Sequence, residues 1–157
     1  MRKRIITPTQ QQTAPPAQNW LDLEEIAEVE ITSEDAAHPI ESALLPGSAS
    51  GWRAAGPGIQ TIRIFFAHPQ RLQRIWMNFL ESRTERTQEY VLRWSSDGGR
   101  SFREIVRQQW NFSPQGATGE TEDHHVELPA VTVLELTIIP DTSGGKAVAS
   151  LEQLRLA

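Results

Sequence analysis

Cysteine is absent from the 157-residue sequence, which excludes disulfide scaffolds, thiolate metal sites, cysteine nucleophiles and iron–sulfur clusters. Long apolar runs are also absent: none approaches the ~20 residues of a membrane-spanning helix, so we expect no membrane partner. Acidic residues outnumber basic ones by 20 to 15, for a net charge of −5, and this makes nucleic acid an unlikely partner. The opening Met1-Arg2-Lys3-Arg4 lacks the apolar segment of a secretory signal behind it, so we expect a cytoplasmic protein.

Glycine and proline, ten of each, are instead well represented, as is typical of a loop-rich β protein. Residues 1–19 are polar and broken by Pro15-Pro16, so they predict a flexible N-terminal tail. The remaining residues, 20–157, have the length of a single domain with one core.

Short stretches of alternating apolar and polar residues fill this domain, separated by turn signals. The alternation is clearest in residues 62–66 and 75–79, which a predicted break at His68-Pro69-Gln70 separates, and again in 131–139. Asp97-Gly98-Gly99 lies between two such stretches and predicts a hairpin turn, because the turn needs residues that tolerate positive φ. Seven or eight short strands without a long amphipathic helix predict an all-β antiparallel sandwich.

The order of several motifs resembles the discoidin-like domains, also called the coagulation-factor C-type or galactose-binding-like fold. The matching motifs are the loop 43–52 that closes on Trp52, the strand motif 60–66, the strand opening 72–75, the hairpin 90–99 and the closing strand 150–156. The resemblance covers about residues 20–157 and implies a jelly-roll β-sandwich of about eight strands. It specifies function much less closely, because this fold is widely reused.

In the galactose-binding members, a glutamate, a histidine and an arginine contact the sugar. The resemblance implies Glu34, Arg53 and Arg83 at these positions, with Arg86 as an alternative to Arg83 because loop lengths differ. Carboxylate and guanidinium groups suit sugar hydroxyls because they accept and donate paired hydrogen bonds. An exposed aromatic ring usually supports the sugar face, and we expect Trp110 or Phe112 in that role, on a polar loop spanning about 110–122.

Many members of the family also hold a structural calcium ion on an aspartate-rich loop and a glutamate of the last strand. Here the corresponding loop, residues 43–52, contains no carboxylate, and Gln153 stands in place of the glutamate. Calcium needs several oxygen ligands that carry negative charge. We therefore expect that this site is lost and that the protein uses no metal and no other cofactor.

Sequence motifs for catalysis are not found: no Ser stands at the centre of a G-x-S-x-G elbow, and 144–147 lacks the pattern of a phosphate loop. We therefore expect a non-catalytic module that binds carbohydrate through loops at one end of the sandwich. The alternative is a protein–protein interaction or scaffold domain that uses the same loops. The sequence leaves the glycan or protein partner and the oligomeric state open.

Overall fold

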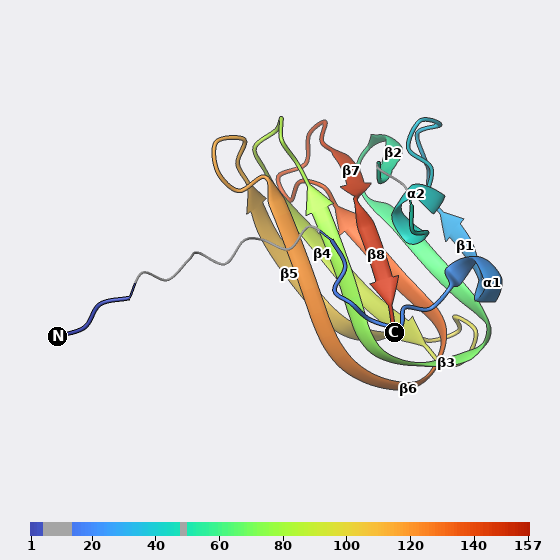
Figure 1. Cartoon of the computed structure of the whole chain (residues 1–157). Helices are drawn as coiled ribbons and strands as arrows, with labels where there is room; N and C mark the ends of the chain where they lie inside the picture. The colour runs from blue at the N-terminus through green and yellow to red at the C-terminus, as the bar shows by residue number, and fades with distance from the viewer. Residues whose placement is uncertain (5–13, 48–49) are drawn as a thin grey trace.

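The computed structural model describes residues 1–4, 14–47 and 50–157, and within them the chain forms eight strands and two one-turn helices (Figure 1). The helices are α1 (Leu23–Ile26) and α2 (Glu41–Leu44). The strands are β1 (Ala27–Ile31), β2 (Trp52–Pro57), β3 (Gln60–Leu80), β4 (Arg86–Ser95), β5 (Arg103–Phe112), β6 (Gly119–Ile139), β7 (Val148–Leu151) and β8 (Gln153–Leu156). Among the described residues no helix is long and apolar enough to cross a membrane. The predicted all-β sandwich of about eight strands is confirmed.

Two long strands, β3 and β6, build both layers of the sandwich. They pair antiparallel along almost their whole length, from Gln60 opposite Ile138 to Leu80 opposite Gly119. Their halves near Gln60 and Ile138 lie in one sheet with β1, β4 and β5, whereas the half of β3 near Leu80 also pairs with β8. Figure 1 shows both strands curving around the base of the sandwich as they pass between the layers. A small second sheet consists of β2 and β7.

The curvature of β3 corrects one detail of the sequence prediction, which placed a break at His68-Pro69-Gln70 between two short strands. The strand continues through this segment, but the register with β6 shifts between Phe65 and Arg74. Proline has no N–H to give to the ladder, and an irregular register bends a strand. The turn residues therefore bend β3 without ending it.

The core lies between the layers and is made by the inward side chains that the alternation predicted. Trp52 is buried at 1% exposure, and Phe79 stacks on Tyr90 with ring centroids 5.5 Å apart. Trp76, which the alternation places outside the core, is also fully buried; its ladder partner on β8 is Arg155.

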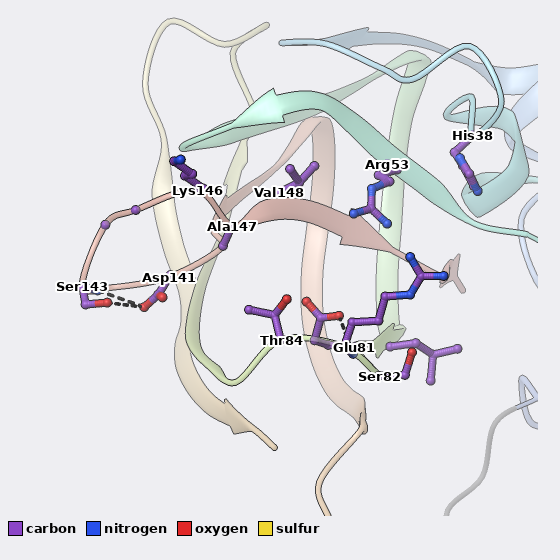
Figure 2. Close-up of a pocket in the computed structure, with 14 residues that line it drawn as sticks. His38, Arg53, Glu81, Ser82, Thr84, Asp141, Ser143, Lys146, Ala147 and Val148 are labelled. Atoms are coloured by element: carbon purple, nitrogen blue, oxygen red, sulfur yellow. Dashed lines mark hydrogen bonds between the residues drawn. The ribbon is translucent and has the colours of Figure 1, made fainter. Parts of the chain in front are cut away.

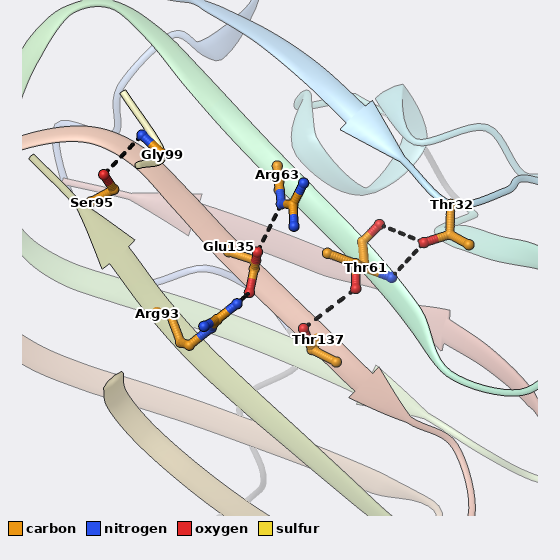
Figure 3. Close-up of polar contacts among 8 residues, drawn as sticks. All are labelled: Thr32, Thr61, Arg63, Arg93, Ser95, Gly99, Glu135 and Thr137. Carbon is orange, nitrogen blue, oxygen red and sulfur yellow. Dashed lines mark hydrogen bonds and ion pairs between the residues drawn. The ribbon is translucent and has the colours of Figure 1, made fainter. Parts of the chain in front are cut away.

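The outer face of the larger sheet is polar and internally paired (Figure 3). The Glu135 carboxylate lies between two guanidinium groups, 2.7 Å from Arg63 Nε and 2.8 Å from Arg93 Nε. At the predicted hairpin turn, the Gly99 N–H donates to Ser95 Oγ at 2.9 Å, and Gly98 and Gly99 have φ of 74° and 93°. The hairpin prediction is thus confirmed, with glycine at the positions that require positive φ.

Candidate functional site

A hollow of about 770 Å³ opens at the end of the sandwich where the loops after β3 and β6 meet. Its walls come from the loop 81–85, the loop 141–147 and the start of β2, with His38 beside them (Figure 2). The volume lies within the range of small-molecule sites in proteins. The candidate ligand site is therefore a loop-built depression at one end of the fold.

Local backbone bonds place two basic side chains side by side at one wall. The Arg53 N–H donates to the His38 carbonyl at 3.1 Å, and the Arg53 carbonyl accepts from the Asp35 N–H at 2.8 Å. Arg53 also pairs with Ser150 across the β2–β7 ladder. These bonds fix Arg53 and His38 at the rim, as Figure 2 shows.

Two further basic side chains, Arg83 and Lys146, come from the loops 81–85 and 141–147. Arg83 lies in the loop between β3 and β4, where its backbone N–H donates to Glu81 Oε2 at 3.3 Å. Lys146 follows Gly144 and Gly145, whose positive φ values of 84° and 88° turn the chain back toward β7. Within the described part of the chain, the exposed side chains of Arg53, Arg83 and Lys146 form no ion pair and donate no hydrogen bond.

The acidic groups of the hollow are held by nearer partners. Glu81 Oε1 accepts from Arg86 Nε at 2.8 Å, and Asp141 Oδ1 accepts from Ser143 N–H and Oγ–H at 3.0 and 2.8 Å. The Ser143 bonds lower the pKa of Asp141, so this carboxylate stays ionised. At the rim, bonds from Ala37 N–H and His38 likewise lower the pKa of Asp35, and Arg53 adds a weaker electrostatic contribution.

Two of the residues expected to bind sugar, Arg53 and Arg83, thus lie together in the hollow. The other expected residues do not line it. Arg86 is 4% exposed and donates to Pro140 O at 2.7 Å as well as to Glu81, so its guanidinium holds the loops together. The expectation that Arg86 contacts a ligand is therefore not supported by its position.

Neither predicted aromatic platform lies in the hollow. Phe112 ends β5 and does not belong to a loop; it is 1% exposed beneath the Arg86 guanidinium, 4.8 Å from the ring centroid, so its face is not open to a sugar. Trp110 is 36% exposed on the same strand but is not among the lining residues. Glu34 also lies outside the lining and accepts from the Ile40 N–H at 2.9 Å.

Sequence reasoning missed several lining residues, of which His38, Glu81, Asp141 and Lys146 carry the chemistry. The adjacent Gly144-Gly145 was the available signal, since two successive glycines after a long strand indicate a turn with positive φ. The motif was tested only as a phosphate loop, and the Lys146 side chain that follows it was overlooked.

The loop that carries calcium in similar domains contains a buried guanidinium here. Arg155, 8% exposed on β8, donates from Nη1 to the carbonyls of Ala43 and Leu154 at 2.8 Å and from Nη2 to Leu45 O at 3.3 Å. Burial lowers the Arg155 pKa, and these three hydrogen bonds go to neutral carbonyls. A cation thus already occupies two carbonyls of this loop, those of Ala43 and Leu45. No cluster of three or more histidine or acidic side chains suited to a metal occurs in the described residues.

Away from the hollow, β6 carries an inward-facing carboxyl pair, Glu120 and Glu122, which the sequence prediction placed in a loop. Burial and then the hydrogen bond with Glu122 raise the pKa of Glu120. Tyr90 Oη lies 2.8 Å from His124 Nε2 beside the pair, and burial raises the pKa of the Tyr90 hydroxyl far above its usual value. This cluster lies between the layers, and none of its four residues is among those that line the hollow.

Comparison with known proteins finds no matching protein-family model and no matching curated protein sequence. Solved structures do match. The CBM32 of AlyQ, in complex with 4,5-unsaturated mannuronic acid, aligns at a TM-score of 0.63 and 17% identity over 89% of this chain and 98% of its own. CpGH89CBM32-5 from Clostridium perfringens, in complex with GalNAc-beta-1,3-galactose, aligns at 0.61 and 19% identity, over 88% and 99%. A pectin-binding carbohydrate-binding module aligns at 0.58 and 14% identity, over 83% and 89%.

These matches cover nearly the full length of each module, so the fold is that of the CBM32 carbohydrate-binding modules, a discoidin-like β-sandwich. The resemblance inferred from the ordered motifs is confirmed at the level of the fold.

Proposed function

We propose that the protein is a non-catalytic carbohydrate-binding module and that the hollow at its loop end receives the sugar. The convergence of Arg53 and Arg83 in one 770 Å³ hollow is the observation that carries the proposal. Both guanidinium groups are exposed and can donate paired hydrogen bonds to sugar oxygens. The sugars named for the similar structures support a glycan as the ligand, although they range from neutral to acidic.

Binding by this module is expected to be weak, because a small polar ligand in an open hollow loses much of its interaction free energy to desolvation. Arg86 donates hydrogen bonds to the Glu81 carboxylate and to the Pro140 carbonyl. These bonds hold the loops after β3 and β6 in fixed positions. Arg86 therefore stabilises the loops that form the site. We further propose that the module needs no calcium, since the Arg155 guanidinium donates to two carbonyls of the corresponding loop, those of Ala43 and Leu45.

A glycan array probed with the purified protein and with an Arg53→Ala, Arg83→Ala variant tests the function. We expect reproducible binding to a defined set of glycans that disappears in the variant. The matched control is Arg100→Ala, which removes an exposed arginine from the hairpin between β4 and β5. A folded wild-type protein that binds no glycan would refute the proposal, and a protein–protein interaction domain would then be the alternative to test by pull-down.

A further inference from the structure

The hollow collects more positive charge than its own carboxylates neutralise. Arg53, Arg83 and Lys146 reach it from three separate segments, and within the described residues none of them has an ion-pair partner. Like charges repel, so an excess of cations in one hollow costs folding free energy, and Asp35 at the rim, whose pKa Arg53 helps to lower, offsets only part of it. The chain as a whole has a net charge of −5, which makes this local excess stand out from the average surface.

The two carboxylates in the lining do not remove the excess. Glu81 is 2.8 Å from the buried Arg86 guanidinium, so its charge is balanced from beneath the hollow. Asp141 is engaged by Ser143, and Arg86 also lies close enough to lower its pKa. With Arg86 included, four basic groups face the two lining carboxylates and the Asp35 carboxylate at the rim, so a net positive charge is left to attract an anion from solvent.

The lining also lacks the group that neutral sugars commonly use. No phenylalanine, tyrosine or tryptophan is among the lining residues that the structure describes, and its apolar part consists of Leu80, Ala147 and Val148. A neutral ring would thus find hydrogen-bond donors without a flat stacking surface. An anionic ring gains charge-assisted hydrogen bonds from guanidinium groups, which are about twice as strong as neutral ones.

On these grounds we infer that the ligand is an acidic saccharide whose carboxylate or sulfate group is bound by Arg53, Arg83 and Lys146. The inference rests on the proposed function and specifies its ligand class. These three cations line the hollow together with the apolar side chains of Leu80, Ala147 and Val148, which the sugar ring contacts. A neutral sugar of the same size is bound more weakly, because it leaves the cations without a counter-ion.

Two matched pairs of polymers test the ligand class by affinity electrophoresis or calorimetry. Polygalacturonate is compared with its fully methyl-esterified form, and dextran sulfate is compared with dextran. Each pair keeps the sugar backbone and removes the charge. We expect binding to the charged member of at least one pair, and binding to its neutral partner that is weaker by about tenfold or more. The pair that shows this difference identifies the bound group as a carboxylate or a sulfate.

Charge-removing variants locate the interaction. Arg83→Gln and Lys146→Gln are each expected to weaken binding of the acidic polymer about tenfold, whereas Arg100→Gln, which removes the same charge at the β4–β5 hairpin, leaves it unchanged. All three positions are exposed, so the variants should fold, and thermal unfolding checks this. Equal weakening by Arg100→Gln would indicate nonspecific attraction and overturn the inference.

Failure of the ligand class is distinguishable from failure of the function. Array binding of neutral glycans that depends on Arg53 and Arg83, together with equal affinity for charged and neutral polymers, overturns the acidic-sugar inference and leaves the carbohydrate-binding function intact. Absence of binding to every glycan, neutral or acidic, by the folded protein overturns both.

Discussion

Replacing Glu120 with glutamine should make the protein less sensitive to alkaline pH. Glu120 points inward from β6 at 6% exposure, beside Glu122. Burial, and after it the hydrogen bond with Glu122, raises the pKa of Glu120. The native state therefore keeps a proton that the unfolded chain releases once the pH exceeds the ordinary glutamate value.

The sign and size of the effect follow from this difference in bound protons. A raised carboxyl pKa in the folded state means that stability is greatest below the unfolded pKa and is lost as pH rises toward the folded pKa. One proton of difference changes the free energy of unfolding by at most about 1.4 kcal/mol per pH unit. For a domain of this size, that corresponds to at most roughly 3–6 °C in Tm per pH unit.

Thermal unfolding of the wild type and Glu120→Gln at pH 5, 6, 7 and 8 measures the difference. Glutamine keeps a donor toward Glu122 but does not titrate, so the variant's advantage in Tm should grow steadily from pH 5 to pH 8. Glu28→Gln, an exposed change on β1, is the matched control and should follow the wild type. Parallel pH profiles for the wild type and Glu120→Gln would refute the reasoning that the native state holds this proton.

Two further predictions concern buried side chains, those of Phe112 and Arg155. Phe112→Ala should lower the free energy of unfolding by about 3–5 kcal/mol in chemical denaturation, whereas Trp110→Ala, on the exposed part of the same strand, should cost much less; equal losses would contradict the burial of Phe112. A chelator should leave Tm unchanged, while Arg155→Met should lower stability by about 1–3 kcal/mol because the carbonyls of Ala43 and Leu45 lose their donor; a fall in wild-type Tm on chelation would show a metal in place.

The fold could be predicted because its signals are local. Alternation at residues 62–66 and 75–79 sets which side chains enter the core, and the glycines at 98 and 99 mark the hairpin. The continuity of β3 through Pro69 was missed, since a proline indicates a break and only the distant partner β6 shows that the ladder resumes. The division of the last strand into β7 and β8 was missed for the same reason: each half pairs with a different strand.

The site was harder to predict because burial at the loop end depends on residues far apart in sequence. Arg83 and Arg86 are three residues apart and chemically alike. Arg86 begins β4 facing inward, where the Pro140 carbonyl, 54 positions away, accepts its hydrogen bond. Arg83 stays in the preceding loop and remains exposed. No local pattern separates the two, since the carbonyl that accepts from Arg86 belongs to Pro140, which follows β6.

Arginine thus has two different roles in this domain, depending on whether its side chain is buried or exposed. Arg86 and Arg155 are buried, and both donate to backbone carbonyls that fix loops: Pro140 after β6, and Ala43 and Leu45 around α2. Arg53 is held in place through its backbone, which leaves its guanidinium exposed at the hollow. A guanidinium stays charged in either environment, because its ordinary pKa lies far above neutrality. Arg86 therefore ties the loop that carries Arg83 to the end of β6, beside the hollow, whereas Arg155 ties the segment around α2 to β8, outside the hollow's lining.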